Sequence, residues 1–300
     1  MATANSTAYP LAAPVVNGSQ ITVQTMLNQP TRITRYLSDI NLRGFISPLI
    51  FANAGGVTGG AVIYDQLTIN DLFSTRDVQN VEPGAEFPIV TSENGEPLVA
   101  PVEKFGGKFF VTDEARDRND GGVIQREGRK LINTITRKID QKAIAALDLA
   151  MSKYPGQTAV GVNWNSVVTN GSSASSAGAW PAADFAKVQL LADTQELGVQ
   201  FDLWVVNPAQ KAQFDLLYGA SSASVLSAYG VRMVASNRVE AGTAYVLESG
   251  QVGEMRTEKP LSTETWRENT TQRTWVQSDI RPVMYVTNPY SLVKVTGLAG

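Results

Sequence analysis

The chain has 300 residues, of which 43% are hydrophobic, and a formal net charge of −3. A chain of this length and composition can bury most of its apolar surface, so we expect it to be globular. It contains no cysteine and no histidine. Disulfide bonds, thiolate nucleophiles, Cys/His zinc sites and the Ser-His-Asp triad are therefore excluded, and we expect no catalytic residues, no cofactor and no metal site.

The charge pattern and the apolar runs also restrict where the chain can act. No run of Lys and Arg stands at either end of the sequence to neutralise a phosphate backbone, so we expect no sequence-specific binding to nucleic acid. No stretch approaches the roughly 18 consecutive apolar residues that a membrane span needs, and the first residues lack the basic start of a signal peptide. These features predict a cytoplasmic protein with no membrane partner.

Residues 1–60 read as an extended arm. They are rich in Ala, Asn, Ser, Thr and Gly, with prolines at positions 10, 14, 30 and 48. Such a segment cannot form a core by itself. The Gly-rich run at 55–60 lacks the Gly-Lys-Ser/Thr ending of a phosphate-binding loop, so a flexible hinge is the better interpretation.

A β pattern follows, with short apolar strands at 61–64, 86–90, 97–100 and 108–111. The sequence Ser-Glu-Asn-Gly-Glu at 92–96 favours a tight turn, which predicts a two-stranded ribbon over about 85–104. An isolated ribbon is only marginally stable in water, so it should lie against another surface, which a neighbouring subunit can supply.

The clearest helix is expected from about Val123 to Ser152, because its apolar residues recur mostly every four positions. The acidic and basic residues at 113–120 precede this helix, and we interpret them as helix caps rather than as a cation site. A Ser/Gly/Ala-rich linker at about 165–180 comes next.

The remainder predicts an α+β fold. A helix is expected from Pro181 to about Thr194 and a buried strand over 203–206, and Asn207-Pro208 should open a further helix through Leu217. Strands are then expected at 231–236, 243–249, 252–257, 261–267, 272–286 and 291–296.

Three stretches, taken with this order of elements, resemble the major capsid proteins of tailed bacteriophages, which have the Hong Kong 97-type fold. They are GGKFFVTDEARDRNDGG, GRKLINTITRKIDQKAIAAL and RTWVQSDIRPVMYVTNPYSLVKVTG. The resemblance implies an N-terminal arm over 1–60, an extended β-hairpin loop over 61–111, a peripheral domain with a spine helix over 112–177, an axial domain over 178–260, and a peripheral-domain long strand with a C-terminal return over 261–300.

The same resemblance implies a function. The chain would be a major capsid protein of the Caudoviricetes, forming homo-hexamers and homo-pentamers in an icosahedral or prolate shell that encloses double-stranded DNA. It would assemble as a procapsid in the host cytoplasm and mature into the virion. The implied partners are a portal, a decoration protein and, because no scaffolding segment precedes the arm, a separate scaffolding protein. The predicted hairpin tip has no lysine, so we expect no covalent cross-link between subunits.

The hypothesis places function in the contacts between subunits. The residues we expect at these contacts are the hairpin turn, Glu93, Asn94, Gly95 and Glu96, and the apolar residues of the arm, Ile21, Met26, Leu27 and Ile33.

Other interpretations stay open at this point. An encapsulin-like protein compartment would have the same fold but a protein cargo. A tail-tube or decoration protein would also self-associate, although such proteins are mostly sheet and the long helix argues against them. A carboxylate enzyme could use a pair such as Glu264 and Glu268.

Overall fold

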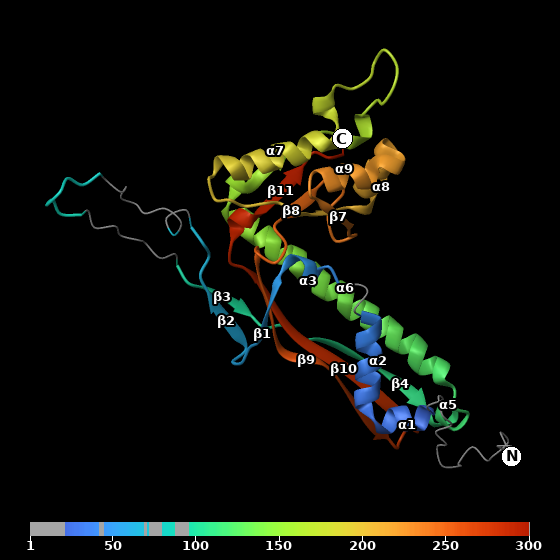
Figure 1. The fold of residues 1–300 in the computed structure, drawn as a ribbon. Coiled ribbons are helices and arrows are strands. Elements are labelled where there is room, and N and C mark those ends of the chain that lie inside the picture. The colour runs from blue at the N-terminus through green and yellow to red at the C-terminus, as the bar shows by residue number, and fades with distance from the viewer. Residues whose placement is uncertain (1–21, 42–44, 69–70, 72–79, 88–95, 300) are drawn as a thin grey trace, which may run out of the picture. The chain divides into compact units, whose positions relative to one another are not determined.

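The computed structural model describes residues 22–41, 45–68, 71, 80–87 and 96–299, with the side chains of all of these except 40 and 41. The chain forms two compact units, here called unit 1 and unit 2 (Figure 1). Unit 1 comprises Met1–Phe45, Val102–Asp140 and Thr257–Pro282, and unit 2 comprises Ile46–Pro101, Gln141–Arg256 and Val283–Gly300. No helix in the described ranges is long and apolar enough to cross a membrane.

The long strands of unit 1 belong to a four-stranded sheet in which β10 pairs antiparallel with β4. Its order is β1-β9-β10-β4, and β1 lies in unit 2. The strands are β1 (Ala52–Gly56), β4 (Phe105–Thr112), β9 (Gly253–Glu268) and β10 (Arg273–Val286). The register of β10 against β4 places Trp275 opposite Phe110 and Val276 opposite Phe109. Because side chains alternate along a strand, Phe109 and Val276 share one face and Phe110 and Trp275 share the other.

Among the described residues, helices pack on the face that carries Phe109 and Val276. They are α1 (Val23–Asn28), α2 (Pro30–Asn41) and the first part of α6 (Gly121–Lys153), preceded by the short α5 (Asp113–Asp117). The buried cluster consists of Val23, Leu27, Ile33, Leu37, Phe109, Val111, Ile124, Ile132 and Val276. A Cβ atom at Gly107 of β4 would stand 2.7 Å from Leu131 Cδ1 of α6, so a larger residue there would have to displace that side chain.

The long helix α6 follows from its sequence. Asp120 Oδ1 accepts a hydrogen bond from the Gly122 amide at 3.0 Å, which caps the first turn. Pro155, just past the end, cannot continue a helix. With 33 residues the helix is about 50 Å long at 1.5 Å per residue. Its buried apolar residues are Ile124, Ile132, Ile135, Ile139, Ala143, Ile144, Leu147, Ala150 and Met151.

Unit 2 is organised around a five-stranded sheet of order β5-β11-β8-β6-β7. The strands are β5 (Thr158–Val160), β6 (Leu203–Val206), β7 (Arg232–Ala235), β8 (Ala244–Leu247) and β11 (Leu292–Thr296). Pairs β6·β7 and β5·β11 are parallel, whereas β8 pairs antiparallel with β6 and β11. Every residue of β6 and β8 is buried, as expected for central strands covered on both faces.

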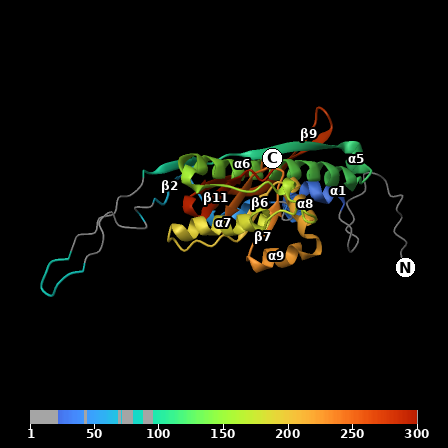
Figure 2. The ribbon, with the colours of Figure 1, turned by 90° about the horizontal axis from the view of Figure 1, so that it is seen from above.

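Alternate residues of these strands enter different cores. Leu203 and Val205 of β6 pack with α3 and with Ala143, Leu147 and other residues of α6, whereas Trp204 and Val206 pack with α7 and α8. Figure 2 shows α6 on one side of these strands and α7 and α9 on the other. The covering helices are α3 (Ser47–Ile50), α7 (Pro181–Thr194), α8 (Pro208–Tyr218) and α9 (Ser222–Ala228). In the described part of the chain, 3₁₀ turns lie at Pro155–Gln157, Trp164–Ser166, Ala177–Ala179, Gly219–Ser221 and Pro289–Ser291.

Most of the elements predicted after residue 110 are confirmed. The predicted strand at 203–206 and the helix from Pro181 to Thr194 match β6 and α7. Asn207 caps α8 as predicted, since its Oδ1 accepts a hydrogen bond from the Ala209 amide at 3.0 Å. The capping interpretation of 113–120 holds for Asp120, which caps α6. The cap of α5 is Thr112, just before this stretch, whose Oγ1 accepts a hydrogen bond from the Ala115 amide.

Two predicted strands, 252–257 and 261–267, are in fact the single strand β9. Pro260 lies inside this strand, although proline cannot donate a hydrogen bond to a ladder. The neighbours of β9 are β10 and the five-residue β1, so most of the 16 residues of β9 have a partner strand on one side only in the described sheet. Proline is tolerated on outer strands, where its missing N–H costs no pairing.

The helices at 23–41 were not predicted. The sequence predicted only an extended arm over these residues. In the structure Pro30 begins α2 at the first helical position, where proline is favoured. The segment does not form its own core, as expected, because it completes the core of unit 1 instead. The five functional parts assigned by resemblance do not share boundaries with the two units, and that five-part division stays a prediction.

If α2 is part of the unit 1 core, shortening Ile33 must destabilise the subunit. Ile33→Ala should lower the free energy of unfolding by about 2–4 kcal/mol through lost burial and a residual cavity, because Ile33 is fully buried. The matched control is Thr31→Ala on the exposed side of α2, which should change it by less than about 0.5 kcal/mol. Urea unfolding of the unassembled chain measures both, and equal effects would show that α2 is not integral to the fold.

Candidate subunit interface

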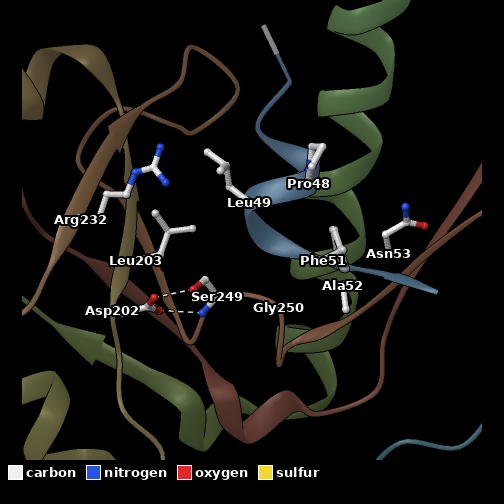
Figure 3. Close-up of a pocket in the computed structure, with 10 residues that line it drawn as sticks. All are labelled: Pro48, Leu49, Phe51, Ala52, Asn53, Asp202, Leu203, Arg232, Ser249 and Gly250. Atoms are coloured by element: carbon white, nitrogen blue, oxygen red, sulfur yellow. Dashed lines mark hydrogen bonds between the residues drawn. The ribbon is translucent and has the colours of Figure 1, made fainter. Parts of the chain in front are cut away.

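Unit 2 contains a shallow pocket (Figure 3). It has a volume of about 370 Å³ and is lined by Pro48, Leu49, Phe51, Ala52, Asn53, Asp202, Leu203, Arg232, Ser249 and Gly250. Asp202 accepts hydrogen bonds from the amide and the hydroxyl of Ser249. Both carboxylate oxygens of Asp202 are thus bonded to Ser249, which fixes the loop after β8.

The carboxylates that could serve an enzyme are engaged in holding the fold. Glu268 Oε2 accepts hydrogen bonds from Arg273 Nε at 2.6 Å, Trp275 Nε1 at 2.9 Å and Thr271 Oγ1 at 2.8 Å. These bonds, led by Arg273, lower the pKa of Glu268 to about 2, so it cannot supply a proton near neutral pH. Its proposed companion Glu264 is exposed and pairs with Lys259 at 3.6 Å.

A buried carboxylate in unit 2, Asp184, is also an anchor. It accepts hydrogen bonds from Trp164 Nε1 at 2.8 Å and from the Val162 amide at 3.1 Å. Burial raises the pKa of Asp184, while these bonds and Lys187 oppose the rise. Within the described residues, no group of three or more acidic side chains is arranged to hold a metal ion.

The feature that needs an explanation is a two-stranded ribbon in unit 2. Strand β2 (Ala61–Tyr64) pairs antiparallel with β3 (Leu98–Pro101), and the register places Ile63 directly opposite Val99. One face of the ribbon is packed, since Val62 and its partner Ala100 are buried. On the other face, Ile63 is 74% exposed and Val99 is 63% exposed.

The packed face ties the ribbon firmly to its unit. The Tyr64 ring lies 4.6 Å from the Tyr285 ring of β10, centroid to centroid. Just beyond β2, Gln66 Nε2 donates a hydrogen bond to the Val286 carbonyl at 3.1 Å. The ribbon is thus held in place with an apolar cross-strand pair facing outward, a surface that natural sheets usually cover.

These contacts correct the predicted ribbon over 85–104. The predicted strand at 97–100 exists, but its described partner is β2 rather than 86–90, of which 88–90 lie outside the described residues. Of the predicted turn at 93–96, residues 93–95 lie outside the described residues, so that turn stays a prediction.

A tight turn is present at residues 82–85. The Ala85 amide donates to the Glu82 carbonyl at 3.0 Å, with Gly84 at a φ of +91°. Proline followed by glycine at positive φ is the signature of a type II turn. Phe87, two residues further on, is 78% exposed. The loop between β2 and β3 thus presents an uncovered aromatic ring beside a tight turn.

The structure separates the predicted contact residues into three groups. Ile21, Glu93, Asn94 and Gly95 lie outside the described residues. Glu96 is exposed just before β3. In the arm, Leu27 and Ile33 are buried in the core of unit 1 and Met26 is partly buried against it. Their side chains are therefore covered within the chain itself, and their role at a subunit contact stays a prediction.

Sequence reasoning missed Ile63, Val99 and Phe87. The pattern Ala-Val-Ile-Tyr was recognised as a strand, but it is apolar on both faces and so does not reveal which face the chain covers. Only the pairing with Leu98–Pro101 shows that Ile63 and Val99 meet on the outer face. No signal in the sequence distinguishes Phe87 from a core aromatic residue.

A long helix against long strands, a second α/β unit and an outward apolar ribbon together describe a protein built to associate. The sequence model of a family described as phage capsid protein matches residues 95–295. The chain belongs to this family, whose members are structural proteins of the virion and assemble into shells with copies of themselves. Among curated proteins, none matches this chain in sequence.

Solved structures share the fold at low sequence identity. The capsid of Cyanophage P-SCSP1u aligns with a TM-score of 0.58 and 11% identity over 84% of this chain and 87% of the other. A structure from Microbacterium phage Oxtober96 aligns with a TM-score of 0.60 and 10% identity over 84% of this chain and 91% of the other. A virus-like particle from Pyrococcus furiosus aligns with a TM-score of 0.57 and 11% identity over 88% of this chain and 98% of the other. The predicted α+β, Hong Kong 97-type fold is confirmed.

The hydrogen bonds of Glu268 should make the stability of the fold depend on pH. Because the pKa of Glu268 in the folded chain is about 2, below the ordinary value of 4.5, these bonds stabilise the fold fully above pH 4.5. This contribution is lost as the pH falls from 4.5 towards 2. Glu268→Gln should therefore be less stable than the wild type at pH 6, and the difference should shrink as the pH approaches 2.

Urea unfolding across this range measures the effect, and ¹³C NMR of the Glu268 carboxyl gives its pKa directly. A stability difference that stays constant from pH 6 to pH 2 would contradict the assigned network.

Proposed function

We propose that this chain is the major capsid protein of a tailed bacteriophage. It assembles with copies of itself into hexamers and pentamers, and these form an icosahedral or prolate shell around double-stranded DNA. The observation that carries the proposal is the Ile63·Val99 pair, which faces outward on a ribbon whose other face is buried. Membership of the phage capsid protein family supports the same conclusion.

Burial of the ribbon by a neighbouring subunit supplies part of the driving force. Covering a fully exposed isoleucine or valine is worth about 1.5–3 kcal/mol. The gain per subunit is small, but every subunit of a closed shell makes the same contact. Repeated contacts of one kind between different surfaces close into rings, and rings tile into a shell. Phe87 and the turn at 82–85 extend the same contact along the loop.

The cargo and the helper proteins are inferred from chemistry and resemblance. The net charge of −3 suits the wall of a container, because a strongly basic inner surface would grip DNA and oppose its movement during filling. A portal, a separate scaffolding protein and a decoration protein are the partners we propose. Assembly would take place in the host cytoplasm, followed by maturation of the procapsid to the virion.

An encapsulin-like compartment is the second candidate function. The virus-like particle from Pyrococcus furiosus matches this fold as well as the phage capsids do. The two candidates differ in what the shell encloses. Shells purified from the organism that produces them should contain nuclease-protected double-stranded DNA if the chain is a phage capsid protein, whereas a co-purifying protein cargo without DNA would favour the compartment.

A charge placed on the outward ribbon face should stop assembly without unfolding the subunit. Ile63→Lys puts an ammonium group where we expect a neighbouring subunit to pack, and the burial of an unpaired charge is strongly unfavourable. The matched control Ile63→Val keeps the face apolar and should assemble like the wild type. A sizing column followed by negative-stain electron microscopy measures assembly, and thermal unfolding of the unassembled fraction checks the fold.

Because Ile63 is exposed in the subunit, both variants should unfold within a few degrees of the wild type. Normal shells formed by Ile63→Lys would contradict the role proposed for this face.

A further inference from the structure

The sheet face of unit 1 that the helices leave open carries a group of aromatic rings, here called the aromatic patch. It consists of Phe110, Trp266 and Trp275 with the cations Lys108 and Arg273. The ring centroids of Phe110 and Trp275 are 5.4 Å apart, and those of Trp266 and Trp275 are 6.3 Å apart with nearly parallel planes. Phe110 is 43% exposed and Trp266 is 40% exposed.

The patch is held in a fixed arrangement. Lys108 Nζ lies 4.4 Å and Arg273 Cζ lies 4.6 Å from the centroid of the Trp275 ring, at cation–π distance. Glu268 accepts hydrogen bonds from both Arg273 and Trp275. Because these contacts already order the rings, binding of a ligand to them costs little additional conformational entropy.

The first 21 residues of the chain have the chemistry that suits such a surface. They contain no Asp, Glu, Lys or Arg, and positions 9–16 read Tyr-Pro-Leu-Ala-Ala-Pro-Val-Val. Proline fixes its own φ and favours the extended polyproline conformation, which docks on grooves lined by aromatic rings. An uncharged segment also avoids repulsion from Lys108 and Arg273.

The route from this segment to the patch is short. Thr265 Oγ1 donates a hydrogen bond to the Leu27 carbonyl at 3.0 Å, which fastens α1 to β9. The next residue, Trp266, points to the opposite face of the sheet. On its outer side β9, with 16 residues, is flanked by β1 with only 5, so most of the β9 edge carries no strand in the described sheet. A chain that leaves α1 at Thr22 therefore needs only to pass around one strand edge.

The length and composition of the connecting residues fit this path. Residues 17–20 are Asn-Gly-Ser-Gln, a polar sequence that favours a change of direction. About six extended residues span roughly 20 Å, which exceeds the distance of about 10 Å between two packed layers. Residues 9–16 can then lie along the patch.

We propose that residues 9–16 dock on the aromatic patch of their own chain, passing around the edge of β9. The tether favours the same chain over a neighbour, since a short linker gives an effective concentration in the millimolar range. The docked segment removes the exposed faces of Phe110 and Trp266 from water in the single subunit. This contact is independent of the shell proposed above, and either can hold without the other.

Disulfide trapping tests the contact, because the chain contains no cysteine of its own. The test variant is Ala12→Cys with Glu264→Cys, since Glu264 is exposed on β9 two residues before Trp266. The matched control is Ala12→Cys with Asn133→Cys, because Asn133 is exposed on α6 in the same unit. A disulfide forms only when the two Cα atoms approach within about 7 Å.

Under mild oxidation we expect the test pair to cross-link several-fold faster than the control pair. Mass spectrometry of a mixture of ¹⁵N-labelled and unlabelled chains should show the bond within one chain. Bonds that join labelled to unlabelled chains would overturn docking in the same chain, and equal rates for the two pairs would overturn docking on the patch.

A second variant tests the rings themselves. Trp266→Ala, added to the test pair, should slow cross-linking several-fold, because it removes the exposed ring but leaves the Glu268 network around Trp275 in place. Replacing Pro10 and Pro14 with Ala should also slow cross-linking of the test pair. Thermal unfolding of each variant checks that unit 1 remains folded, and an unchanged cross-linking rate in a folded Trp266→Ala chain would show that the patch does not hold the segment.

Discussion

The packing of apolar side chains on one helix, α6, is the interaction on which both units depend. Its early residues Ile124 and Ile132 lie in the core of unit 1, and its later residues, such as Ala143 and Leu147, lie in a core of unit 2. A helix of 33 residues is too long to be covered by one small core, and most of the stability of such a helix comes from tertiary packing. The strands β9 and β10 likewise contribute residues to each unit.

With these cores complete, the chain still leaves apolar surface uncovered in its described part, and this surface points to association. Ile63 and Val99 meet on the outer face of the β2–β3 ribbon. The carboxylates examined as catalytic candidates serve the fold instead, since Glu268 fixes Arg273 and Trp275 and Asp184 fixes Trp164. We therefore expect this protein to act through contacts of its surfaces with other subunits, as membership of the phage capsid protein family implies.

Elements that depend on residues close in sequence were predicted well, whereas those that depend on contacts with distant residues were not. The periodicity of α6 and the Asn207-Pro208 start of α8 are local signals, and both were predicted close to their observed bounds. The partner of Leu98–Pro101 is a non-local choice, so the Asn94-Gly95 turn signal gave the wrong strand pairing, and the second turn signal, Pro83-Gly84, was overlooked. The helices at 23–41 were missed because their apolar residues pack against β4, β10 and α6, which are distant in sequence. Exposure of Ile63 and Val99 could not be predicted, because an apolar strand does not state which face is covered.

The central claim is that this chain builds a shell from copies of itself. The most direct measurement is to express the full chain alone, separate it on a sizing column and image the fractions by negative-stain electron microscopy. Closed shells, curved sheets or five- and six-fold rings are the predicted result, and rings without shells would indicate that a scaffolding protein is needed to close them. A small particle that does not assemble at any concentration, even with crowding agents, would contradict the account.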